Sequence, residues 1–168
     1  QSSKSVMEIV YVWWLWIVVA MVLIAGPIFW ARPTPRERRL AALRTDAMAL
    51  GLKLSTEYVD GWTKQRLNRS QVQVYRLVCP TGSRTFRLWR FPGRIDWTPT
   101  PDTPGRMGRD GVLGDLVQTL PVSILSVAVD TWSVSLAVDE DAPGLTAAQI
   151  DGHLRDLKAI LSPSETPQ

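Results

Sequence analysis

The chain begins with an unbroken run of uncharged, mostly apolar residues from Ile9 to Trp30. A helix over 9–30 would be about 33 Å long at about 1.5 Å per residue, and the hydrocarbon core of a bilayer is about 30 Å thick. Trp and Tyr favour the headgroup level, and aromatic residues stand at both ends of the run: Tyr11, Trp13, Trp14 and Trp16, then Phe29 and Trp30. The pattern predicts a single transmembrane helix over 9–30.

Basic residues are unevenly placed around this run. Only Lys4 precedes it, inside a stub of residues 1–8 whose part before Met7 we interpret as a tag remnant or an upstream extension. Five arginines follow it: Arg32, Arg36, Arg38, Arg39 and Arg44. Because loops rich in Lys and Arg stay in the cytoplasm, we expect a signal-anchor in the bacterial inner membrane, with the N-terminus outside and the C-terminal domain cytoplasmic.

A second helix is predicted over 35–50. Thr34 and Glu37 have the spacing of a capping box, with Pro35 at the first helical position. Leu40, Leu43, Ala47 and Leu50 recur every three or four residues and form one apolar stripe, and Gly51 suits the C-terminal cap. We therefore expect residues 31–51 to form a basic, amphipathic juxtamembrane helix.

The rest of the chain alternates between strand-like and turn-like patterns. Runs rich in β-branched and aromatic residues predict strands over 52–58, 71–79, 84–91, 122–129 and 132–138. Turn residues at 80–83 and 130–131 predict two hairpins. Helices are expected over 111–120 and 146–161, and irregular segments over 60–70, 92–111 and 162–168. The fold class predicted for the domain of residues 52–161 is α+β, an antiparallel sheet with packing helices.

The residue types that build most catalytic and metal sites are scarce. The chain has one Cys and one His, Cys79 and His153, whereas a zinc site needs three or four ligands. The glycines of 105–111 lack a phosphate-binding motif, and no nucleophile elbow occurs. We predict no catalytic, cofactor-binding or metal-binding residues, no cofactor, and a buried Cys79.

Charge is divided between two halves of the chain. Residues 32–109 hold 16 Lys and Arg against 6 Asp and Glu, a net charge of +10, and residues 110–168 hold 2 against 9, a net charge of −7. The basic half is expected to contact anionic headgroups or a membrane-protein partner, through Arg32, Arg36, Arg38, Arg39, Arg44, Arg84, Arg87, Arg90 and Arg94. Alternatively, the acidic half faces a basic partner, or the two halves pair within the fold.

The segment after the apolar run has a recognisable layout. Arg32-Pro33 followed by the basic stretch Arg36–Arg39 resembles the YajC family, the small accessory subunit of the bacterial Sec translocase. Residues 35–44 with Gly51-Leu52 also resemble uncharacterised single-pass inner-membrane proteins of proteobacteria. The second resemblance implies no activity, and neither resemblance transfers a functional residue.

The sequence favours a non-enzymatic, membrane-anchored protein whose cytoplasmic domain binds a protein partner or scaffolds a membrane complex. One alternative is a tethered enzyme with a site near 92–111, using the carboxylates of Asp96, Asp102, Asp110 or Asp115. Another is a nucleic-acid binder through 84–94, where arginines and aromatic residues alternate. We do not expect nucleic acid to be the main partner, because a strand with its aromatic residues inward gives the same pattern.

Overall fold

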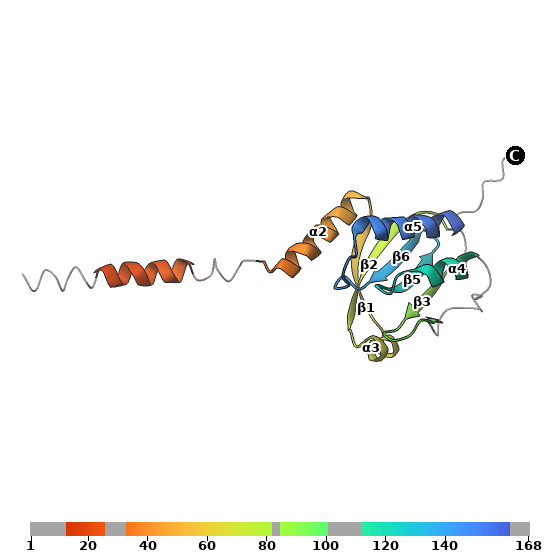
Figure 1. The fold of residues 1–168 in the computed structure, drawn as a ribbon, viewed down its shortest axis with the longest axis horizontal. Coiled ribbons are helices and arrows are strands. Elements are labelled where there is room, and N and C mark those ends of the chain that lie inside the picture. The colour runs from red at the N-terminus through yellow and green to blue at the C-terminus, as the bar shows by residue number, and fades with distance from the viewer. Residues whose placement is uncertain (1–12, 26–32, 82–84, 101–111, 162–168) are drawn as a thin grey trace, which may run out of the picture. The chain divides into compact units, whose positions relative to one another are not determined.

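The computed structural model describes residues 13–25, 33–81, 85–100 and 112–161 of the chain (Figure 1). The chain divides into two compact units, residues 1–39 and residues 40–168. The second unit contains the sheet, so the α+β class predicted for the domain is confirmed.

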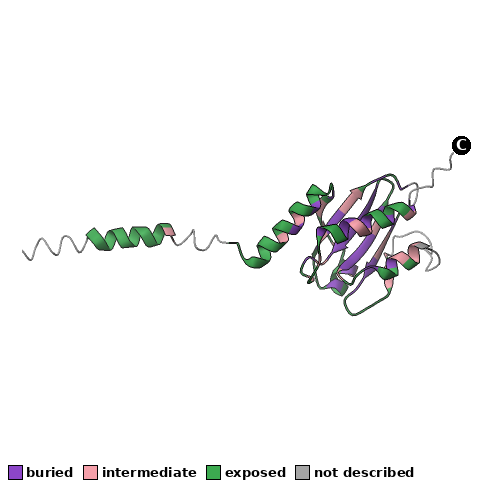
Figure 2. Ribbon diagram, turned by 45° about the horizontal axis from the view of Figure 1, so that its top comes forward, coloured by how far each residue is buried: buried purple, intermediate pink, exposed green. Residues whose placement is uncertain are grey.

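The first unit contains a helix over residues 13–25, whose apolar side chains from Trp13 to Leu23 are exposed (Figure 2). None of the helices in the four described ranges is long and apolar enough to cross a membrane. The predicted transmembrane helix over 9–30 is therefore wrong, and residues 9–12 and 26–30 lie outside the described ranges.

Other predictions depended on that helix and fail with it. They are the single-pass signal-anchor topology and the inner-membrane localisation, with the N-terminus outside and the C-terminal domain cytoplasmic. The segment 31–51 therefore cannot be called juxtamembrane. The expected contact of the arginines with anionic headgroups followed from the charge of the basic half and stays an untested prediction.

Helix α2 (Pro35–Ala49) begins as its sequence predicts. Thr34 N donates to Glu37 Oε2 at 2.7 Å and Glu37 N donates to Thr34 Oγ1 at 3.2 Å, which completes the capping box. The hydrogen bonds from Thr34 lower the pKa of Glu37. Gly51, with φ of +84°, ends the helix in the left-handed conformation that glycine tolerates best. Of the predicted stripe, Leu43 and Ala47 are buried, whereas Leu50 is exposed.

Six antiparallel strands form one sheet in the order β1-β2-β6-β5-β3-β4. Their bounds are Lys53–Tyr58 (β1), Gln71–Val78 (β2), Phe86–Arg90 (β3), Trp97–Pro99 (β4), Ile124–Asp130 (β5) and Ser133–Val138 (β6). The predicted hairpin of 122–129 and 132–138 is confirmed as β5–β6. Strand β4 lies within the stretch 92–111 that we expected to be irregular.

The other predicted hairpin is wrong, because β2 and β3 are not neighbours. After β2 the chain runs on beside the β5–β6 turn, where Cys79 N donates to Trp132 O and Thr81 N donates to Thr131 O. The Thr81 hydroxyl also donates to the carbonyl of Asp130. Strand β3 therefore pairs with β5, and β6 and β5 lie between it and β2 in the sheet.

Helices cover the two faces of the sheet unequally. Helix α5 (Ala147–Leu161) packs on β2 and β6, and α4 (Val112–Thr119) packs against α5 (Figure 1). The main core lies under them and includes Tyr75, Val127, Leu136, Ile150 and Leu154. Cys79 belongs to the same core, so its predicted burial is confirmed.

A short helix, α3 (Gly61–Leu67), lies within the segment 60–70 that was predicted to be irregular. Asp60 accepts a hydrogen bond from Thr63 N at 3.0 Å at one end, and Asn68 takes a left-handed conformation with φ of 53° at the other. Leu67 and the partly buried Trp62 join a second, smaller apolar cluster. This cluster covers one end of the face opposite α5 and leaves the remainder of that face to the polar residues described next.

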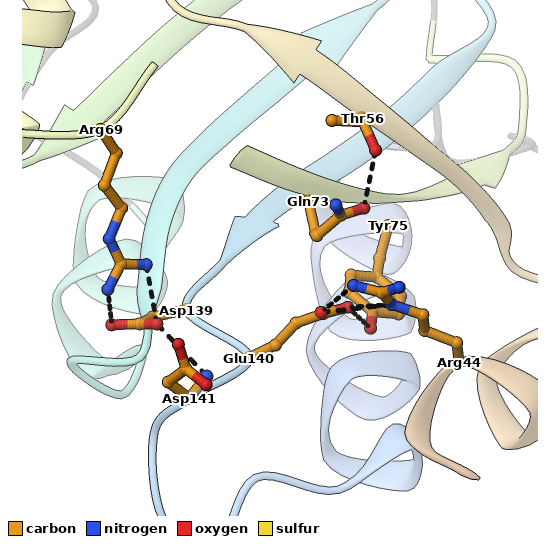
Figure 3. Close-up of polar contacts among 8 residues, drawn as sticks. All are labelled: Arg44, Thr56, Arg69, Gln73, Tyr75, Asp139, Glu140 and Asp141. Carbon is orange, nitrogen blue, oxygen red and sulfur yellow. Dashed lines mark hydrogen bonds and ion pairs between the residues drawn. The ribbon is translucent and has the colours of Figure 1, made fainter. Parts of the chain in front are cut away.

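Among the described residues, ion pairs join the basic and acidic halves of the chain (Figure 3). Arg44 Nη2 lies 2.6 Å from Glu140 Oε2, and Arg69 Nη1 lies 2.8 Å from Asp139 Oδ1. The alternative in which the two halves pair within the fold is therefore correct at these positions.

Candidate functional site: the concave face of the sheet

An ion pair joins two strands that are not neighbours. Arg87 Nη2 on β3 lies 3.0 Å from Glu57 Oε2 on β1, although β2, β6 and β5 separate the two strands. At about 4.8 Å per strand, a flat sheet would hold β1 and β3 about 19 Å apart. The sheet must therefore curl strongly, and the face that carries Glu57 and Arg87 is concave.

The floor of this concave face is made of small side chains. Ser126 and Ala128 of β5 and Ser135 and Ala137 of β6 lie in the middle of the sheet and line a small cavity of about 10 Å³ together with Glu57 and Arg87. Large residues there would keep β1 and β3 apart. The run of Ser and Ala therefore allows the curl that brings Glu57 within reach of Arg87.

Two guanidinium groups share the Glu57 carboxylate. Arg76 Nη2 on the adjacent strand β2 lies 3.1 Å from Oε1, while Arg87 approaches Oε2. The three side chains are between 24 and 37% exposed, so water screens the pairs in part. The carboxylate thus positions two arginines on the concave face.

A larger cleft of about 350 Å³ opens next to the Glu57–Arg87 pair. The end of β1 and the residues after it form one part of its lining, Tyr58 to Asp60, and the start of β3 and the end of β5 form another, Thr85 to Arg87 and Ala128 to Asp130. Trp89 and Thr100 complete the lining. The cleft therefore lies where the two sides of the curled sheet approach each other.

Trp89 links the cleft to the small cavity, because it lines both. The guanidinium carbon of Arg87 lies 5.9 Å from the centre of its ring, close to the limit for a cation–π contact. The indole N–H of Trp89 is buried and has no hydrogen-bond acceptor within the described ranges. Such a donor costs about 1–3 kcal/mol when it is left unsatisfied.

The predicted contact arginines differ in their surroundings where the structure describes them. Arg36, Arg38 and Arg39 are exposed on α2, and Arg94 is exposed after β3. Arg44 and Arg87 are held by Glu140 and Glu57, and Arg32 and Arg84 lie outside the described residues.

Arg90 lies on the opposite face from Arg87 and is buried. Its Nη1 and Nη2 both donate to the carbonyl of Leu120 at 3.0 Å, and its guanidinium carbon lies 4.2 Å from the centre of the Trp97 ring. Burial lowers the pKa of this group. A side chain in this position is not presented to a nucleic acid or any other surface ligand.

The structure describes two of the four carboxylates of the alternative enzyme site. Asp96 and Asp115 are both exposed, the first between β3 and β4 and the second on α4, while Asp102 and Asp110 lie outside the described residues. Where the structure is described, it contains no group of three His, Cys, Asp or Glu side chains that could hold a metal ion. His153 lies partly buried on α5.

Sequence reasoning missed Glu57, Asp60 and Asp130 as members of a site. The position of Asp60 could have been predicted, because Asp is a preferred N-cap residue and α3 begins directly after it. No sequence pattern marks Glu57 or Asp130 as a site residue. Glu57 meets Arg87, and Asp130 lines the cleft, only because the sheet curls.

The chain matches no protein-family model, and comparison with curated proteins and with solved structures gives no significant match. The likeness to YajC and to small proteobacterial membrane proteins therefore stays an untested prediction, and no function can be transferred to the residues of the concave face.

Proposed function

We propose that this chain is a non-enzymatic protein that binds a protein partner through its α+β domain. The observation that carries the proposal is the cleft of about 350 Å³ beside β1, the strand at one edge of the sheet. Backbone groups along the edge of a sheet can pair with another chain, and a neighbouring cleft can accept that chain's side chains. A partner protein supplies both kinds of group.

Exposed apolar side chains near the ends of the strands support the same function. Tyr58 at the end of β1 is 79% exposed, and Trp132 in the β5–β6 turn is 70% exposed. Tyr and Trp are enriched where proteins bind one another, because each covers a large area at a small cost in side-chain entropy. Tyr58 also lines the cleft, so one candidate anchor for a partner lies at the site itself.

The lining of the cleft favours a partner over a small-molecule substrate. Small-molecule sites are mostly apolar and enclosed, with a few convergent polar groups. Here Asp60, Asp130 and Thr85 are exposed around the cleft. A mixed lining of this kind, at the edge of a sheet, resembles the surface that a polypeptide covers.

Site-specific crosslinking in the native cells tests this function. A photoreactive phenylalanine derivative replaces Tyr58 in the full chain, and the same group at the exposed Val122, which does not line the cleft, is the control. We expect Tyr58 to capture one defined protein that also binds the purified chain, and Val122 to capture it poorly. The absence of any such protein from Tyr58, Val122 and Trp132 alike would contradict the proposal.

A further inference from the structure

Strand β1 offers an open edge with a defined set of backbone groups. It pairs with β2 along its whole length, and among the described residues no strand pairs with its other side. Just beyond the strand, Val59 N donates to Ser70 O, which fixes the alternation of the antiparallel ladder. Odd-numbered residues therefore direct their N–H and C=O groups to β2, and Thr56 and Tyr58 direct theirs to the open side.

The same end of β1 borders the cleft. Tyr58, Val59 and Asp60 contribute to its lining from this side, and Thr85 and Arg87 of the β3 segment contribute from the other. A chain that pairs with Thr56 and Tyr58 would run along this border. Its side chains alternate between two sides, so every second one would be directed towards the cleft.

The charges around the cleft favour a basic side chain. Asp60 and Asp130 are both exposed there, while Arg87 is already engaged with Glu57. Opposite charges that meet in a docked complex favour one partner over another and speed association. A Lys or Arg side chain would be attracted to the two carboxylates, and a Glu side chain would be repelled.

We propose that β1 pairs with an extended segment of the partner, which adds a seventh strand to the sheet and places a Lys or Arg side chain in the cleft near Asp60 and Asp130. This inference rests on the proposed protein-binding function and specifies the chemistry of the partner. Main-chain pairing with Thr56 and Tyr58 supplies affinity, and the basic side chain supplies specificity.

Two synthetic peptides test the inference with the full chain labelled with ¹⁵N. Both are seven-residue peptides of alternating Thr and Val with blocked ends, one with a central Lys and one with a central Glu. We expect the Lys peptide to shift the amide signals of β1 and the indole signal of Trp89, and to bind about tenfold more tightly than the Glu peptide. If the Lys peptide gives no shift at about 1 mM, or shifts only signals away from β1 and β3, the inference is wrong.

A pair of substitutions at Thr56 tests the backbone pairing. Thr56→Pro removes the N–H on the open side and leaves the ladder with β2 intact, because proline is tolerated at the outer side of an edge strand. Thr56→Val keeps the N–H and removes only the hydroxyl, which donates to Gln73 Oε1 at 3.1 Å. We expect Thr56→Pro to weaken peptide binding at least tenfold and Thr56→Val to change it less than twofold. Equal effects would exclude main-chain pairing.

The charge is tested separately with the double variant Asp60→Asn and Asp130→Asn. Asparagine caps a helix about as well as aspartate, so α3 is preserved. We expect this variant to bind the Lys and Glu peptides equally well, and a retained preference for Lys would contradict the role of the two carboxylates. Should crosslinking capture a partner that does not touch β1 while the peptides fail, the protein-binding function would stand and this inference would fall.

Discussion

The phenol of Tyr75 donates a hydrogen bond of 2.6 Å to Oε1 of Glu140, a residue 65 positions later in the chain, and both side chains are buried (Figure 3). The same carboxylate accepts hydrogen bonds from Arg44 Nε and Nη2 on α2. One carboxylate after β6 therefore connects β2 with α2. Since only Leu43 and Ala47 of α2 are buried, this contact is a large share of what holds the helix to the sheet.

Replacing Glu140 with Gln is expected to lower the free energy of unfolding by about 1–3 kcal/mol, because Arg44 loses its counter-charge while Tyr75 keeps an acceptor. Arg44 is 39% exposed, so water compensates part of the loss. Urea unfolding followed by circular dichroism measures the change. Asp156→Asn, at an exposed position of α5, is the control and should change stability by less than about 0.5 kcal/mol.

Tyr75 also makes stability depend on pH in the alkaline range. Burial, and then the hydrogen bond to Glu140, raise the pKa of Tyr75 in the folded protein above its ordinary value of about 10. Folding therefore favours the protonated phenol, so this contribution is fully present below about pH 10 and is lost as the pH rises towards the pKa of the folded state. We expect wild-type stability to fall more steeply above pH 10 than that of Tyr75→Phe. Parallel slopes in the two proteins would contradict the assignment.

We expect the curl of the sheet to depend more on the small side chains of β5 and β6, such as Ser135, than on the Glu57–Arg87 ion pair. Ser135→Leu places a large side chain beneath Glu57 and Arg87, where the cavity is only about 10 Å³, so we expect a loss of about 1–3 kcal/mol and a wider separation of β1 from β3. Amide chemical shifts of β1 and β3 report the separation, and urea unfolding reports the loss.

A double-mutant cycle with Glu57→Gln and Arg87→Gln gives the comparison. Both side chains are partly exposed, so we expect a coupling energy of only about 0.2–1 kcal/mol. If the coupling energy exceeds the loss of unfolding free energy caused by Ser135→Leu, the ion pair, and not the small side chains beneath it, determines the curl.

Local features of the fold followed from the sequence, and long-range ones did not. The Thr34 and Glu37 cap and the β5–β6 hairpin depend on neighbours within a few residues, and both formed as predicted. The turn signal at 80–83 gave no indication that Cys79 and Thr81 would continue past the β5–β6 turn. A turn-rich segment is compatible with a hairpin and with a connection that passes over other strands. Only the pairing of distant strands distinguishes the two.

The candidate site was less accessible to sequence reasoning than the fold. The stretch 84–94 correctly predicted a strand, but the expected sorting of aromatic residues inward and arginines outward is wrong for Arg90, which is buried and donates to Leu120 O. The meeting of Arg87 with Glu57 was not predicted. The prediction over 9–30 depended on composition and length together, and of this run the structure describes residues 13–25.

Arg90 provides a last test, because its two arginine-specific contacts cannot be made by lysine. The planar guanidinium donates twice to the Leu120 carbonyl and stacks over Trp97, whereas an ammonium is a compact point charge. We expect Arg90→Lys to lower the free energy of unfolding by about 1–3 kcal/mol, and Arg94→Lys, at an exposed position, to change it by less than about 0.5 kcal/mol. Denaturation of the two variants in parallel checks this, and equal stabilities would show that the buried guanidinium contributes only its charge.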